Sequence, residues 1–196
     1  MSGRPAAFLD RDGVLNELVP DPASGDPESP LRITDVRLIT GAAAAARELA
    51  EAGYLLVCVT NQPAAAKGVV TVAQLHAIHG HVLELLDREG ARIGASRLCM
   101  HHPLANVPSL SGPCDCRKPE PGMLLDAATA LGLDLAASWM FGDSETDVTA
   151  GQRAGCHTAL IENRDSAHRR SGDVRPDLCA RDLAEAVARV LDQPRE

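Results

Sequence analysis

Apolar and polar positions alternate along this chain in two rhythms. Short apolar runs of four or five residues are typical of strands that are buried on both faces of a parallel sheet. Longer helix-like segments separate them, and two of these segments end at a glycine, Gly53 and Gly90. We therefore predict strands over residues 6–9, 55–59, 97–100, 138–141 and 158–161, and helices over residues 41–52, 71–89, 121–131, 145–154 and 182–191.

The regular exchange of strands and helices predicts an α/β fold, a parallel sheet flanked by helices. Thr71 is a suitable N-cap for the second helix, and Pro121 is well placed in the first turn of the third. No internal repeat interrupts the pattern. We expect a single domain over residues 1–196.

One irregular segment, residues 17–37, breaks the pattern early in the chain. It carries prolines at positions 20, 22, 27 and 30, which are too many for a helix. We expect a loop or small flap beside the functional site.

Composition limits the classes of function. The 196 residues carry a net charge of −8, without a basic run, and 2% aromatic residues. These values disfavour binding to nucleic acid or to an anionic membrane. No apolar run approaches the ~20 residues of a membrane span, and no secretory signal is recognisable, so we expect a cytoplasmic protein whose six cysteines are reduced thiols or metal ligands.

Polar residues follow the predicted strands at the edge where parallel sheets bind ligands. Asp10 and Asp12 come directly after the first strand, residues 60–62 (Thr-Asn-Gln) after the second, and residues 142–147 after the fourth. Buried carboxylates cost several kcal/mol unless they are paired or bind a metal. Together these segments point to a metal-assisted reaction.

Four ordered motifs carry a family resemblance. Asp10-x-Asp12-Gly13, Thr60, Lys118 and Gly142-Asp143-x-x-x-Asp147 resemble the motifs of haloacid dehalogenase (HAD) superfamily phosphatases. The resemblance implies a Rossmann-like, three-layer α/β fold with the nucleophile strand in the centre of the sheet, without a large cap domain. It also implies a phosphoric monoester hydrolase that works through an aspartyl-phosphate.

The chemistry of the residues agrees with this activity. Asp10 is the expected nucleophile, and Asp12 the general acid and then base. Mg²⁺ is the expected cofactor, held by Asp10, the backbone carbonyl of Asp12 and Asp143. Thr60 and Lys118 are expected to stabilise negative charge on the transferring phosphoryl group.

Residues next to these motifs in the sequence are expected to have supporting roles. Asn61 and Gln62 are expected to orient the loop and bind substrate. Asp147 either helps to position the metal or favours the N-terminus of the helix electrostatically. Arg11 is interpreted as a solvated side chain.

A cysteine and histidine cluster is the second strong signal. Cys99-x-His101 and Cys114-x-Cys116 supply three thiolates and one imidazole, a complete tetrahedral set for structural Zn²⁺. His102 is an alternative to His101 as the ligand. We expect the resulting zinc loop, residues 99–118, to deliver Arg117 and Lys118 to the phosphate.

The other cysteines and histidines favour structural interpretations. Cysteines 58, 156 and 179 lie in or beside apolar runs and are predicted to be small core residues. Histidines 76, 79 and 81 lie along one predicted helix, where a solvated helix face is favoured over a metal site.

Within the superfamily, the zinc loop resembles those of phosphatases that act on a heptose 1,7-bisphosphate or on histidinol phosphate. The heptose type is followed more closely, through Cys114-Asp115-Cys116-Arg117-Lys118-Pro119-x-Pro121-Gly122-Met123. This implies removal of the 7-phosphate of D-glycero-D-manno-heptose 1,7-bisphosphate, with Arg117 contacting the sugar or its second phosphate.

Two alternatives stay open: another small phosphate ester, such as histidinol phosphate, or a catalytically silent module that binds a phosphorylated ligand. Pro63-Ala64 and Ser144 depart from the family pattern near the substrate. We expect a phosphorylated sugar as the partner and a monomeric protein.

Overall fold

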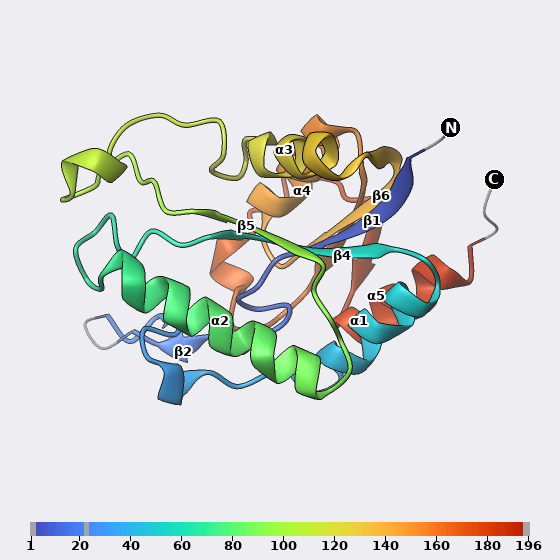
Figure 1. Cartoon of the computed structure of the whole chain (residues 1–196), viewed down its shortest axis with the longest axis horizontal. Helices are drawn as coiled ribbons and strands as arrows, with labels where there is room; N and C mark the ends of the chain where they lie inside the picture. Colours follow the sequence, from blue (N-terminus) through green and yellow to red (C-terminus); the bar gives the residue numbers. More distant parts are fainter. Residues whose placement is uncertain (1–2, 22–23, 194–196) are drawn as a thin grey trace.

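A computed structural model describes residues 3–21 and 24–193 and contains a six-stranded parallel sheet (Figure 1). Pro22, one of the prolines of the insertion, lies outside the described residues. The sheet contains β1 (Arg4–Leu9), β4 (Leu55–Asn61), β5 (Ala95–Cys99), β6 (Leu133–Gly142), β7 (His157–Ile161) and β8 (Leu178–Ala180), in the order β5-β4-β1-β6-β7-β8. The helices are α1 (Ala42–Glu51), α2 (Val72–Arg88), α3 (Gly122–Leu131), α4 (Glu145–Ala154) and α5 (Leu183–Leu191).

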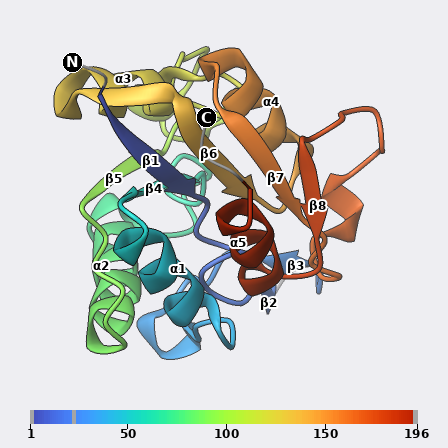
Figure 2. The ribbon, with the colours of Figure 1, turned by 90° about the vertical axis from the view of Figure 1, so that its right-hand side faces the viewer.

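Helices cover both faces of the sheet, which gives three layers (Figure 2). Along β1, Ala7 and Leu9 pack into a core with α1, α2 and α5, whereas Ala6 and Phe8 pack into a second core with α3 and α4. Successive side chains of a strand point to opposite faces, so an uninterrupted apolar strand supplies both cores. The predicted α/β fold is confirmed.

Differences from the predicted elements occur where the apolar signal is weak. The strand predicted over residues 138–141 begins earlier, as β6 at Leu133, because its partly exposed first half pairs with the start of β1. The edge strand β8 was not predicted, since three residues carry little periodicity.

Within the insertion, β2 (Val19–Pro20) and β3 (Pro27–Glu28) form a short antiparallel pair, followed by a 3₁₀ turn over Ile33–Asp35. Further 3₁₀ turns span Pro108–Leu110 and Ala167–Arg169. The insertion therefore has the form of a small flap with little regular structure, and part of it reaches the site described below.

Local signals set the helix boundaries. Thr71 caps α2 in a reciprocal capping box with Gln74, as its position predicted. Pro121 is the N-cap of α3, one position before the helix begins. None of the described helices combines the length and the apolar character that a membrane crossing requires.

The strand order determines where the polar strand ends meet. Strand β1 lies between β4 and β6, and all three run parallel. The residues that follow Leu9, Val59 and Phe141 are therefore brought to one edge of the sheet.

Candidate active site

A pocket of about 340 Å³ opens at the carboxyl edge of the sheet. Its lining includes seven residues to which the sequence assigned a role: Asp10, Asp12, Thr60, Asn61, Arg117, Lys118 and Asp147. Further lining residues come from the insertion and from the segment after β7. Side chains distant in sequence thus surround one cavity.

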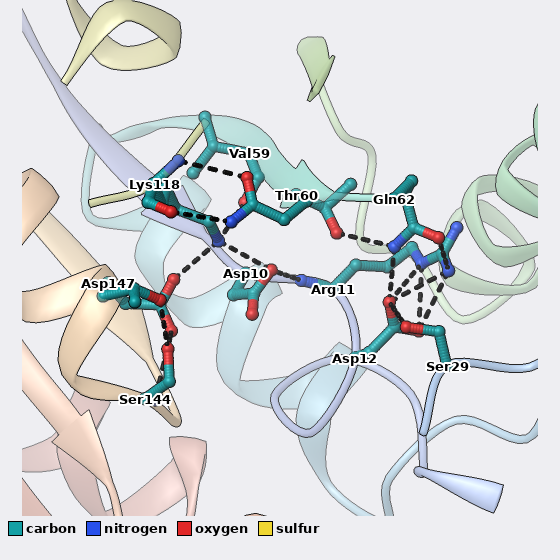
Figure 3. Close-up of polar contacts among 12 residues, drawn as sticks. Asp10, Arg11, Asp12, Ser29, Val59, Thr60, Gln62, Lys118, Ser144 and Asp147 are labelled. Carbon is teal, nitrogen blue, oxygen red and sulfur yellow. Dashed lines mark hydrogen bonds and ion pairs between the residues drawn. The ribbon is translucent and has the colours of Figure 1, made fainter. Parts of the chain in front are cut away.

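Lys118 is the buried cation at the centre of the site (Figure 3). Its Nζ lies 2.9 Å from Asp10 Oδ1 and 2.6 Å from Asp147 Oδ1, and it donates to the Val59 carbonyl at 2.8 Å. Burial alone would lower the pKa of Lys118, but the two carboxylates outweigh it and raise that pKa. Lys118 is therefore a permanent positive charge beside Asp10.

Asn61 fixes the backbone that carries this lysine. Its side-chain amide donates to the Lys118 carbonyl at 3.0 Å and accepts from the Lys118 N–H at 3.1 Å. Asn61 also lines the pocket, so a contact with substrate is open to it.

Asp143 has the environment of a metal ligand. It is fully buried, and neither carboxylate oxygen has a hydrogen-bond partner among the described residues. Burial, and then the charges of Asp10 and Asp147, raise the pKa of Asp143 to about 8. One oxygen from each of these three aspartates lies within 4.8 Å of the others. Such a set of carboxylate oxygens, with both Asp143 oxygens unpaired, fits a hard divalent cation.

Two glycines allow this close approach. Gly13 has φ +90°, and a Cβ there would lie 2.0 Å from Asp143 Oδ2. A Cβ at Gly142 would lie 2.1 Å from the Cβ of Asp147. Any side chain at either position would collide with the carboxylate cluster.

The surroundings of Asp10 and Asp12 shift the pKa values of these two residues in opposite directions. Burial raises the pKa of Asp10 to about 6, although Lys118 opposes this. The pKa of Asp12 is lowered, because the Arg11 guanidinium and hydrogen bonds from Asn16 and Arg11 outweigh the effect of burial. Asp12 is thus held as a carboxylate.

Arg11 is not solvated, and that prediction is wrong. It is fully buried, with Nε and Nη2 both within 3.2 Å of the two Asp12 oxygens, and Nη2 donates to Gln62 Oε1 at 2.8 Å (Figure 3). A buried guanidinium is tolerated because the adjacent carboxylate neutralises it. The sequence does not indicate toward which side of the strand end Arg11 turns.

Asp147 contributes its two oxygens to different neighbours. Oδ2 accepts from the backbone and the hydroxyl of Ser144, which closes a capping box at the start of α4, and Oδ1 contacts Lys118. The helix-terminal interpretation therefore agrees with the structure. Asp147 also belongs to the aspartate cluster, so its participation in metal binding stays open.

Cys99, His101, Cys114 and Cys116 converge on one point. Their Sγ atoms are 3.1 to 3.7 Å apart, and His101 Nδ1 lies 3.4 Å from Cys116 Sγ and 3.8 Å from Cys99 Sγ. Tetrahedral ligands about 2.3 Å from Zn²⁺ are about 3.7 Å apart, so the cluster could hold zinc. His102 instead accepts a hydrogen bond from the Leu104 N–H, which favours His101 over His102 as the fourth ligand.

Two structural interpretations of single residues are wrong. Cys58 and Cys156 are buried as predicted, but Cys179 is exposed, because on the edge strand β8 it points away from the core between two buried residues. His79 is buried rather than solvated, because it shares the inner face of α2 with Ile78 and Val82.

Five pocket residues received no individual role from the sequence. They are Glu28 and Ser29 of the insertion, Lys67 after β4, Thr146 in α4, and Arg169 after β7. Ser29 donates to Asp12 Oδ2 at 2.9 Å, and Arg169 lies 3.4 Å from Glu28 Oε2. For Glu28 and Ser29 the signal was the expectation that the insertion lies beside the site, whereas nothing in the sequence indicated Lys67 or Arg169.

Comparisons with known proteins agree with the geometry. Residues 115–186 match a family described as HAD-hydrolase-like. The chain is 40% identical to the D-glycero-β-D-manno-heptose-1,7-bisphosphate 7-phosphatase of Rhodopseudomonas palustris, over 83% of this chain and 86% of that protein. It is 39% identical to the Escherichia coli protein of the same name, over 80% of this chain and 78% of that protein.

A solved structure is similar over nearly the whole length. It is D,D-heptose 1,7-bisphosphate phosphatase from B. bronchiseptica complexed with magnesium and phosphate, with a TM-score of 0.78 and 29% identity. The alignment covers 95% of this chain and 98% of that one.

Proposed function

Because the chain belongs to the heptose-1,7-bisphosphate 7-phosphatase family of HAD-like hydrolases, we propose that it removes the 7-phosphate of D-glycero-D-manno-heptose 1,7-bisphosphate. The observation that carries this proposal is the pairing of a buried Asp10 with Lys118, next to the unpaired carboxylate of Asp143. This is the arrangement that an attacking carboxylate and a phosphoryl group require.

The reaction has two steps. Asp10 attacks phosphorus, the bond from phosphorus to the sugar oxygen breaks, and that oxygen takes a proton from Asp12. Water then attacks the aspartyl-phosphate and gives a proton back to Asp12, which frees Asp10 and inorganic phosphate. Thr60 and Lys118 stabilise charge on the phosphoryl oxygens in both steps.

Without substrate, the adjacent Arg11 guanidinium keeps Asp12 as a carboxylate. A carboxylate is the form that accepts a proton from water in the second step. Asp12 therefore has to take up a proton when substrate binds, before it can act as the acid of the first step. A phosphate dianion near Asp12 raises the pKa of Asp12 by repulsion and favours that uptake.

Mg²⁺ would be held by Asp10, Asp143 and the backbone carbonyl of Asp12, and it supplies the charge that lets two carboxylates and a phosphate share one pocket. Zn²⁺ would be held by the cysteine and histidine cluster in a structural role. Its ligands include Cys116, two residues before Lys118.

Cations that the reaction itself does not use line the pocket and favour a bisphosphate. Lys67, Arg117 and Arg169 line the pocket in addition to Lys118, and the charge of Arg169 is partly offset by Glu28. A second phosphate is attracted to such a lining, whereas the cationic amine of histidinol phosphate is repelled. The histidinol phosphate alternative is therefore less well supported.

Phosphate release tests the reaction. We expect Mg²⁺-dependent release from the heptose 1,7-bisphosphate, lost by about 10³-fold or more in Asp10→Asn because the nucleophile is removed. Asp87→Asn, an exposed aspartate on α2, is the matched control and should leave the rate unchanged. An active Asp10→Asn variant would refute the nucleophile, and a wild-type protein that binds but never hydrolyses would favour the silent module.

A panel of esters tests the substrate. Arg117→Gln should lower kcat/KM on the bisphosphate about 10- to 100-fold, the worth of a charged hydrogen bond, and much less on the heptose 7-monophosphate. Arg92→Gln, on the surface, is the control. Faster hydrolysis of histidinol phosphate than of the heptose bisphosphate would overturn the substrate assignment. Monomeric state, cytoplasmic location and a single domain over residues 1–196 stay predictions from the sequence.

A further inference from the structure

Gln62 lies behind the active-site pocket rather than in its wall. It follows the last residue of β4, is 1% exposed, and does not line the pocket that holds Asp10 and Lys118. It does line a neighbouring cavity of about 200 Å³ that shares Glu28, Ser29 and Lys67 with the active-site pocket, so its predicted contact with substrate stays a prediction. The hydrogen bonds of its side chain all go to residues of the site.

Three side chains surround the Gln62 amide (Figure 3). Nε2 donates to Asp12 Oδ2 at 2.6 Å and to Thr60 Oγ1 at 2.9 Å, and Oε1 accepts from Arg11 Nη2 at 2.8 Å. Both amide hydrogens and the carbonyl oxygen are therefore engaged.

The orientation of this amide is fixed by charge. If Oε1 and Nε2 exchanged places, the oxygen would face the Asp12 carboxylate and the NH₂ group would face the guanidinium of Arg11. Both contacts would be repulsive in a buried site, so Arg11 and Asp12 together hold the amide in one orientation.

The fixed Gln62 amide determines in which direction the Thr60 hydroxyl can donate. A hydroxyl has one hydrogen, and Thr60 Oγ1 already accepts a hydrogen bond from Gln62. The Thr60 proton therefore points elsewhere, and Thr60 is buried except where it lines the pocket. The hydroxyl is thus prepared to donate into the space where the phosphoryl group is expected.

We propose that Gln62 is a positioning residue, which uses its amide to aim the Thr60 hydroxyl proton at the transferring phosphoryl group. The proposal rests on the phosphatase function given above. Arg11 and Asp12 act through Gln62, because they set the orientation that Thr60 experiences. A donor oriented in advance needs no reorganisation when charge develops on the phosphoryl oxygens.

A double-mutant cycle in the full-length, Mg²⁺-loaded protein tests the proposal. Gln62→Glu presents only acceptor oxygens to Thr60, whose proton then turns toward the new carboxylate and is lost to the pocket. We expect Gln62→Glu and Thr60→Val each to lower kcat about 10- to 100-fold with little change in KM. In the Thr60→Val background, Gln62→Glu should lower kcat by a clearly smaller factor than in the wild type, because only its repulsion of Asp12 remains once the Thr60 hydroxyl is gone.

The control is Gln74→Glu on α2, where the capping box accepts glutamate equally well. Gln62→Met, which leaves the Thr60 hydroxyl free to rotate, should lower kcat about 3- to 10-fold and provides a second variant if the glutamate prevents folding. Independent multiplication of the Gln62→Glu and Thr60→Val effects, or full activity in both Gln62 variants, would overturn the proposal.

A binding measurement separates this proposal from the function itself. Inorganic phosphate should bind more weakly to Gln62→Met, which adds no charge, than to wild type, but equally to Thr60→Val with and without Gln62→Met. If the wild-type protein hydrolyses no ester of the panel, the proposed function fails, while this phosphate-binding cycle still decides whether Gln62 acts through Thr60.

Discussion

Single residues in this site acquire their chemistry from neighbours rather than from their type. Asp10 and Asp12 are both buried aspartates two positions apart, yet the pKa of one is raised to about 6 and that of the other is lowered. The difference is that Arg11 packs directly on Asp12, whereas Asp10 is buried and shares Lys118 with Asp147, whose charge adds to the effect of burial. Separate roles for the two carboxylates follow from these environments.

A glycine provides the sharpest test at this scale. Gly13→Ala places a Cβ about 2 Å from Asp143 Oδ2 in a backbone with φ +90°, so both the collision and the strain act against the carboxylate cluster. We expect at least a 100-fold loss of kcat/KM and weaker Mg²⁺ binding, measured by phosphate release and titration calorimetry. Gly25→Ala, at φ +78° with no atom near its Cβ, carries the backbone strain alone and should keep full activity. Equal losses in the two variants would contradict the steric argument.

At the scale of elements, the loop between β5 and α3 has little regular structure but has to position Lys118 accurately. Apart from the 3₁₀ turn at Pro108–Leu110 it has no regular structure, yet it ends in Lys118 at the centre of the site. The four candidate zinc ligands lie at its two ends, so the proposed Zn²⁺ would hold these ends together in place of a backbone ladder.

Metal analysis and one cysteine pair test the loop. We expect about one Zn²⁺ per chain, and Cys116→Ser should lower the zinc content, the Tm and the phosphatase rate together. Cys179→Ser, an exposed cysteine outside the cluster, is the matched control and should change none of them. A zinc-free wild-type protein whose Tm is insensitive to chelators would refute the structural zinc.

For the whole molecule, the carboxylate cluster makes stability depend on pH and on metal. In the metal-free protein the pKa of Asp143 is raised from 3.8 to about 8, and that of Asp10 to about 6. Between pH 3.8 and about 8, the folded state therefore binds more protons than the unfolded state. The free energy of unfolding falls as pH rises through this range. The contribution of Asp143 and Asp10 to stability is full below about pH 4 and is lost progressively toward pH 8.

Thermal unfolding at two pH values checks this linkage. The Tm of the metal-free protein should fall by about 5 °C or more from pH 5 to pH 8, and Mg²⁺ should restore more of it at pH 8, where the carboxylates it binds are ionised. Asp143→Asn should remove most of this pH dependence and the response to Mg²⁺, whereas Asp87→Asn should preserve both. A wild-type Tm that rises over this range without metal would contradict the argument.

The sequence by itself determined the layers of the fold and the carboxylates and phosphate-binding residues at the centre of the site. Apolar strands that supply both cores, and polar residues at their carboxyl ends, follow from local periodicity, and this is why Asp10, Thr60 and Asp143 could be found without coordinates. Short edge pairings such as β8 could not, because three residues carry no period of their own.

Only the tertiary structure decided where side chains without a periodic signal point. Arg11 turns inward onto Asp12, His79 turns into the core, and Gln62 lies behind Thr60 instead of in the pocket wall. The insertion brings Ser29 onto Asp12, and Arg169 reaches the pocket from a distant segment. These outcomes depend on which segments meet across the sheet edge, and that choice is made by packing and charge over the whole chain rather than by neighbouring residues in the sequence.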